Sequence, residues 1–120
     1  MKNNIIYDRE LVVRKIKQEF PDDDQDEILK VLDQYGVESY EQERERVQVA
    51  IIKLAEGNLE KLKTEVSGAK GDFRDTLGAA EYPEQSRKAT WRMKDKEKAN
   101  KIVESDRKKY LEWLEMGRPE

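Results

Sequence analysis

Apolar residues recur every three or four positions through most of this 120-residue chain. That spacing places them on one face of an α-helix, because a helix completes one turn every 3.6 residues. No segment of any length alternates apolar with polar residues, the pattern that a half-buried strand requires. The sequence therefore predicts an all-α protein, a small bundle of four to five helices with short connections between antiparallel neighbours.

The predicted core is thin for a chain of this length. Leu, Ile, Val and Phe together supply 26 residues, while 42% of all residues are charged. Positive and negative side chains nearly balance, since the net charge is only −3. Disorder is typical of chains with few large apolar residues and a high net charge, so this balance favours a folded, heavily charged helical protein.

Capping signals divide the first half of the chain into three predicted helices. Asp8 caps the first helix, and the acidic run at 22–27 begins the second, where the helix dipole favours negative charge. Gly36 is placed to end the second helix. The third begins in a capping box at 39–42, which puts Tyr40 on its apolar face.

A sustained apolar stripe predicts a further helix over residues 58–81, with Asn58 as its N-cap. Gly68, Gly71 and Gly78 interrupt it, and each costs about 1 kcal/mol relative to Ala in a helix interior. Two interpretations stay open. Either the helix breaks near Gly68, or the glycines allow a neighbouring helix to approach closely.

The rest of the chain predicts a linker and one more helix. Residues 84–94 contain little apolar material and are predicted to be a basic polar linker. A C-terminal amphipathic helix follows at 95–117, with Tyr110 and Trp113 on its apolar face. The predicted organisation is a helical bundle domain at 1–83, the linker, and this helix packed on or near the bundle.

Several function classes are excluded or disfavoured by composition. The chain has no Cys and no His, so disulfide scaffolds, thiol nucleophiles, Cys/His zinc sites and histidine acid–base catalysis are all excluded. It also lacks a glycine-rich phosphate loop and a serine nucleophile motif. Its carboxylates alternate with Lys and Arg at the spacing of solvated helix-face ion pairs. We therefore expect no enzyme and no cofactor.

The sequence also predicts a cytoplasmic protein that makes no membrane contact. No run of about 18 apolar residues is present, which is the length that a membrane-spanning helix needs. The first residues turn charged before an apolar stretch of secretory type can form. The absence of Cys is compatible with a reducing compartment.

The acidic run also overlays part of an EF-hand calcium loop. Position 6 of that loop would be Glu27, where the sharp turn uses Gly, and residues 28–35 have a helical period that would straighten the loop. The sequence therefore favours carboxylates that cap and solvate a helix over a calcium site. The four overlaid carboxylates are Asp22, Asp24, Asp26 and Asp33.

A basic segment at 87–101 surrounds one tryptophan and is the main candidate for partner binding. Closely spaced cations suit a phosphate backbone, and an indole can stack on an unpaired base. The alternative is a solvated linker and helix surface, with the tryptophan packed back onto the bundle. Because the tryptophan lies outside any apolar stripe, we favour an exposed contact. The candidate partner-binding residues are Arg87, Lys88, Trp91, Arg92 and Lys94.

These observations favour a non-enzymatic module for protein–protein interaction or self-association, with a homodimer as one form of the latter. Residues 7–46 carry a net charge of −6 and residues 84–112 carry +4, so the two parts could pair within or between molecules. The alternative function is weak, salt-sensitive nucleic-acid binding through residues 87–101. Salt separates the two, because phosphate-driven binding weakens steeply as salt rises.

Residues 28–66 resemble a ubiquitin-associated (UBA) three-helix domain, through a first helix that ends in a glycine loop and a second that leads through Gly57-Asn58 into a third. The resemblance implies a second alternative, a UBA-like binding module. Residues 73–83 are similar to small bacterial helical proteins without a known activity, which implies no site. The positions that the UBA resemblance carries over are Tyr35, Gly36, Val37, Leu62 and Val66.

Overall fold

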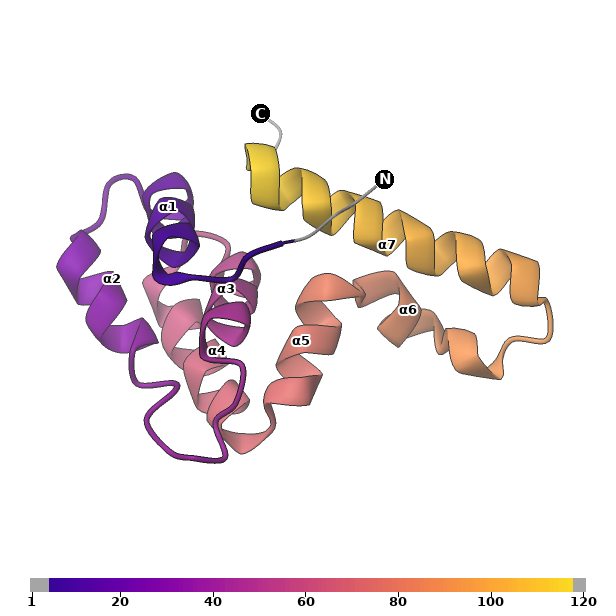
Figure 1. The fold of residues 1–120 in the computed structure, drawn as a ribbon, viewed down its shortest axis with the longest axis horizontal. Coiled ribbons are helices and arrows are strands. Elements are labelled where there is room, and N and C mark those ends of the chain that lie inside the picture. Colours follow the sequence, from indigo (N-terminus) through magenta and orange to yellow (C-terminus); the bar gives the residue numbers. More distant parts are fainter. Residues whose placement is uncertain (1–4, 118–120) are drawn as a thin grey trace.

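The computed structural model describes residues 5–117, and all of its regular secondary structure is helical (Figure 1). No strand occurs in this range, so the all-α prediction is confirmed. The predicted count of four to five helices is too low. The elements are α1 (Arg9–Glu19), α2 (Gln25–Leu32), α3 (Arg44–Ala55), α4 (Leu59–Gly71), α5 (Phe73–Glu81), α6 (Pro83–Lys88), the 3-10 turn η1 (Thr90–Arg92) and α7 (Lys96–Met116).

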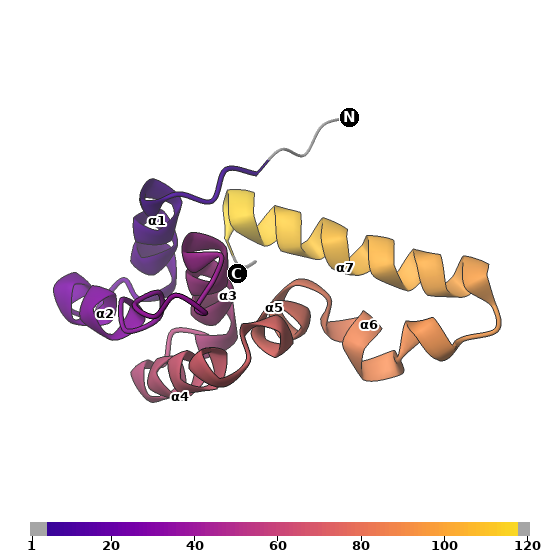
Figure 2. The same cartoon turned by 60° about the horizontal axis from the view of Figure 1, so that its bottom comes forward.

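Helix α3 is the centre of a bundle that α1 to α5 form (Figures 1 and 2). It packs against α1, α4 and α5. Its buried residues lie on every side, unlike those of a surface helix, which bury one stripe. This explains why the second half of α3 is a nearly continuous apolar run. The buried residues of α3 are Val47, Gln48, Val49, Ala50, Ile51, Ile52 and Ala55.

Local capping chemistry sets several of the helix ends, as predicted. Asp8, Asp24 and Asn58 each accept hydrogen bonds from backbone N–H groups in the first turn of α1, α2 and α4. Gly57, between α3 and α4, has a left-handed backbone with φ of 73°. A Cβ atom there would lie 2.7 Å from the backbone oxygen of Glu19, so the turn packs against the end of α1 only because this residue is glycine.

The third helix begins later than predicted. It starts at Arg44, and Tyr40, which was expected on its buried face, is 62% exposed. The reason lies in Glu41, whose carboxylate is buried and accepts hydrogen bonds from the backbone N–H groups of residues 36, 37 and 38. These bonds hold residues 36–43 as an ordered loop in place of a helical turn.

The predicted helix over 58–81 is broken, but at Asp72 and not near Gly68. Asp72 has an extended backbone, and its side chain accepts a hydrogen bond from the Arg74 N–H at 3.0 Å, which begins α5. Gly68 lies within α4, and nothing outside the helix would meet a Cβ atom there within 4 Å. That glycine therefore neither breaks the helix nor allows a close approach.

The prediction of a linker at 84–94 is wrong, because these residues form α6 and η1. Pro83 suits the first turn of α6, where its missing N–H is not needed. Asp106 of α7, only 2% exposed, accepts hydrogen bonds from the N–H groups of Glu84 at 3.3 Å and Gln85 at 2.8 Å. This long-range cap stabilises a helix of only six residues, too short to be stable alone.

Residues 83–109, which we call the arm, project from the bundle as a helical hairpin (Figures 1 and 2). The molecule measures 46 × 32 × 26 Å, and its radius of gyration is 14.8 Å. A compact domain of this length would have a radius of gyration of about 13.6 Å. The elongation therefore comes from the arm. No helix within residues 5–117 is long and apolar enough to cross a membrane.

The C-terminal end of α7 is part of the bundle core. Tyr110, Trp113 and Leu114 are buried there. The Trp113 indole N–H donates to a Glu19 carboxylate oxygen at 3.1 Å, and the buried Lys15 ammonium lies 3.9 Å from the centre of the indole ring. Because the same ammonium donates to the Trp113 carbonyl oxygen, α1 and α7 are joined by packing, a cation–π contact and hydrogen bonds.

Candidate functional site

The five predicted partner-binding residues lie together where α6 connects to α7. We call Arg87, Lys88, Trp91, Arg92 and Lys94 the tip cluster. The first two lie in the last turn of α6, where the helix dipole favours cations. The next two belong to η1, which packs against α7. Trp91 is 62% exposed, as the sequence predicts, and therefore does not pack back onto the bundle.

The charge of the molecule is divided between the arm and the bundle. The arm contains ten Lys and Arg against five Asp and Glu, a net charge of +5, whereas residues 5–82 contain twelve against nineteen, a net charge of −7. Within the tip cluster, Arg87 and Lys88 both pair with Glu84, and the Arg87 guanidinium lowers the pKa of that carboxyl. Arg92 and Lys94 form no ion pair within residues 5–117. Their charges are therefore available to a partner.

A groove of about 310 Å³ lies beside the tip cluster, between α6 and α7. Lys98 and Lys101 are exposed in it and form no ion pair within the described chain. Within α7, Lys98, Lys101, Ser105 and Lys109 follow one another at spacings of three or four, so they share one face of that helix. Lys98 and Lys101 belong to the basic segment that the sequence predicts, but the groove itself was not predicted, because α6 was expected to be a linker. The lining residues are Glu84, Lys88, Lys98, Lys101, Ile102, Ser105 and Lys109.

The loop at 36–43 is a second surface feature, which we call the acidic loop because residues 37–43 contain three glutamates and no Lys or Arg. Burial raises the pKa of Glu41, but the hydrogen bonds from Lys70 and the three backbone N–H groups outweigh burial and lower that pKa to about 2. The Tyr35 hydroxyl donates to the Gln42 carbonyl oxygen at 2.7 Å. These bonds fix the loop backbone although it belongs to no helix.

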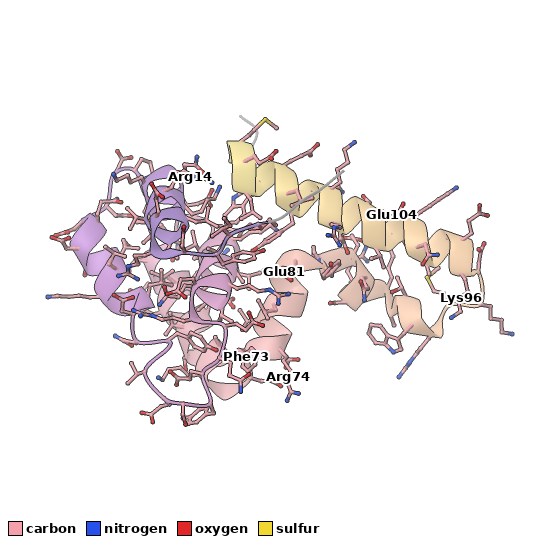
Figure 3. All side chains as sticks on the ribbon, viewed as in Figure 1. Arg14, Phe73, Arg74, Glu81, Lys96 and Glu104 are labelled. Carbon is pink, nitrogen blue, oxygen red and sulfur yellow. The ribbon has the colours of Figure 1, made fainter. Side chains whose placement is uncertain are left out.

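The acidic loop displays two large apolar side chains. Val37 is 70% exposed and Tyr40 is 62% exposed. Tyr40 also lines a hollow of about 230 Å³ beside Phe73 and Arg74, where α4 meets α5 (Figure 3). Single exposed apolar residues are normal on protein surfaces. Here both lie on one loop, whose backbone is fixed by the hydrogen bonds of Glu41.

A cleft of about 470 Å³ opens between the bundle and α7. In it, Arg46 pairs with Glu81 through two hydrogen bonds of 2.7 and 2.9 Å. Burial raises the pKa of Tyr7 to about 12. The hydrogen bond to Glu81 raises the pKa of Arg46 above the ordinary value for arginine. The Tyr110 hydroxyl is buried without a hydrogen-bond partner among the described residues. Tyr7 and Arg46 therefore keep their protons at neutral pH, and Arg46 forms an ion pair with Glu81.

The acidic run does not form an EF-hand loop. Asp24 caps α2, and residues 25–32 are helical, so the predicted capping role is confirmed. Asp33 instead accepts two hydrogen bonds from Arg9 at 2.6 and 2.7 Å, and the Arg9 guanidinium lowers the pKa of that carboxyl. Within residues 5–117, no group of three or more Asp and Glu side chains is arranged to hold a metal ion.

The positions that the UBA resemblance carries over are mostly buried. Tyr35 and Leu62 are fully buried and Val66 is 2% exposed, so these side chains cannot reach a partner. Only Val37 is well exposed among the five. A binding surface in this region would therefore consist of the acidic loop and not of the face of α4 that carries Leu62 and Val66.

Comparisons with protein-family models, with curated proteins and with solved structures found no match for this chain. The resemblances drawn from residues 28–66 and 73–83 therefore stay predictions.

Proposed function

We propose that this protein is a non-enzymatic interaction module of the cytoplasm, and that its tip cluster binds an acidic surface of a partner protein, which can be a second copy of itself. The observation that carries the proposal is the 62% exposure of Trp91 between cations on a projecting hairpin. Tryptophan and arginine are the side chains in which interface binding energy concentrates. The arm presents both types away from the bundle.

Electrostatics supports an acidic protein partner. The net +5 of the arm attracts a negative surface, and the cations around Trp91 can steer the encounter. Glu84, Asp95 and Glu97 interrupt the positive charge, and the bundle carries −7. A continuous polyanion would meet these carboxylates, whereas a protein surface of limited area need contact only the tip cluster.

Nucleic-acid binding is the second candidate, and the lysine groove is the observation that favours it. Lys88, Lys98, Lys101 and Lys109 line this groove. A single strand could place phosphates there and stack one base on Trp91. This mode predicts that the logarithm of the affinity falls linearly with the logarithm of salt concentration.

The test compares three full-length proteins in pull-downs from lysate of the source, each with and without nuclease. They are the wild type, the tip variant Trp91→Ala/Arg92→Glu, and the control Lys30→Glu, which makes the same charge change on an exposed residue of α2. We expect the wild type and the control to retain the same protein after nuclease treatment, and the tip variant to lose it.

Two outcomes would count against this proposal. Retention by the tip variant at the wild-type level would remove the tip cluster as the site. Loss of all retained material on nuclease treatment would move the assignment to nucleic acid. Anisotropy of a labelled single-stranded oligonucleotide, titrated from about 50 to about 500 mM NaCl, would then measure the salt slope directly.

A further inference from the structure

The acidic loop and the tip cluster are complementary in charge and alike in exposed apolar content. The tip cluster offers one large aromatic side chain among four cations, with Trp91 62% exposed. The acidic loop offers Val37 and Tyr40, 70% and 62% exposed, beside glutamates. Only five large hydrophobic residues are strongly exposed in residues 5–117, and these surfaces hold three of them.

The two surfaces cannot meet within one molecule. The loop joins α2 to α3, and Tyr40 lies beside Phe73 and Arg74 at one side of the bundle (Figure 3). The tip cluster lies next to Lys96, at the far end of the 46 Å long axis (Figure 3). Both surfaces are also fixed in place. Glu41 holds the loop through four hydrogen bonds, and Asp106 holds α6 of the arm.

We infer that the acidic loop is the docking site for the tip cluster of a second copy of this chain. The inference rests on the proposed function, because it names the partner that the tip cluster binds. In the contact, Trp91 covers Val37 and Tyr40, while Arg92 and Lys94 lie against Glu38 and Glu43, the two exposed glutamates of the loop. Two such contacts related by a two-fold axis close a dimer in which each arm reaches the bundle of its partner.

Complementation between two variants tests this contact. The tip variant Trp91→Ala/Arg92→Glu lacks the first surface, and a loop variant Tyr40→Ser/Glu38→Lys lacks the second. All four positions are exposed, so both variants are expected to keep the wild-type far-UV circular dichroism and unfolding midpoint. The control Lys30→Glu changes the charge without touching either surface.

Sedimentation velocity gives the mass of each protein over a concentration series at low and high salt. We expect the wild type and the control to gain mass with concentration, less so at high salt, and each variant alone to associate at least tenfold more weakly. An equimolar mixture of the two variants should associate again, because each supplies the surface that the other lacks.

Three results would overturn the inference: a wild type of monomer mass at every concentration, variants that associate as the wild type does, or a mixture that stays monomeric. The proposed function is judged separately. If the wild type is a monomer while the tip variant still loses a partner in the pull-down, the proposed function stands and this inference fails. If the tip variant retains every partner and associates normally, both fail.

Discussion

At the scale of single residues, Glu41 decides the conformation of the acidic loop. Its carboxylate accepts hydrogen bonds from the backbone N–H groups of Gly36, Val37 and Glu38 and from the Lys70 ammonium at 2.8 Å. A buried carboxylate is costly unless it is paired and hydrogen-bonded in this way. One side chain thus replaces the helical turn that the local sequence predicts.

Glu41 should also make the stability of the protein depend on pH. Its pKa is about 2 in the folded protein and 4.5 for an unperturbed group. Since the folded value is the lower one, its contribution is complete above pH 4.5 and is lost as the pH falls toward 2. In urea unfolding, Glu41→Gln should lower the free energy of unfolding by about 1–3 kcal/mol at neutral pH. The stability of the Glu41→Gln variant should fall less steeply than that of the wild type as the pH drops below 4.5.

Glu38→Gln is the matched control, because it removes an exposed carboxylate from the same loop. It should keep the neutral-pH stability of the wild type. Parallel pH profiles for the wild type and Glu41→Gln would contradict the role assigned to Glu41.

At the scale of elements, the arm depends on a cap that comes from another helix. α6 has six residues, too few to be stable alone, and none of them is buried. The Asp106 carboxylate of α7 accepts the N–H groups of Glu84 and Gln85 and so joins the start of α6 to the middle of α7. The geometry of the tip cluster follows from this junction.

Loss of that cap should loosen the arm and leave the bundle unchanged. Losing a capping side chain costs about 1 kcal/mol, which corresponds to roughly fivefold faster exchange through local opening. We expect Asp106→Ala to speed amide hydrogen exchange at residues 84–95 by that factor or more, with bundle amides unaffected. Glu104→Gln, an exposed change on the same helix, should alter neither region (Figure 3). Unchanged exchange at 84–95 in Asp106→Ala would show that packing alone holds the arm.

At the scale of the whole molecule, α7 has two roles. Its first half carries the exposed cations of the arm, and its last turns complete the core that α1 begins. Arg14 donates to the Leu114 carbonyl oxygen at 3.1 Å, and Lys15 lies against Trp113. Any truncation that removes the basic segment together with α7 would therefore also open the core, so tests of binding by the arm require point variants.

Replacing each of the two tryptophans by Ala should change the stability of the protein by very different amounts. Trp113 is 4% exposed and Trp91 is 62% exposed. In urea denaturation followed by circular dichroism, Trp113→Ala should lower the free energy of unfolding by about 3–5 kcal/mol, through lost burial and the cavity left behind. Trp91→Ala should change it by less than about 0.5 kcal/mol. A similar loss for both would mean that the tip packs on other parts of the protein in solution.

Local patterns were sufficient to predict much of the fold and part of the site. The caps at Asp8, Asp24 and Asn58 and the amphipathic C-terminal helix are confirmed, because side chains within one or two turns of each other decide them. The exposure of Trp91 was predicted for the same kind of reason, since it lies outside any apolar stripe. The five tip residues are also neighbours in sequence.

Only the tertiary structure decided the features that depend on partners distant in sequence. Asp106 caps α6 from more than twenty positions away, and Lys70 supports Glu41 from 29 positions away. Lys109 reaches the groove only because α6 packs against α7. The sequence by itself therefore determined the helical class, several helix ends and the basic, aromatic character of the arm. The acidic loop, the groove and the distance between the two charged surfaces arose from packing, because a buried carboxylate takes whatever donors the fold brings to it.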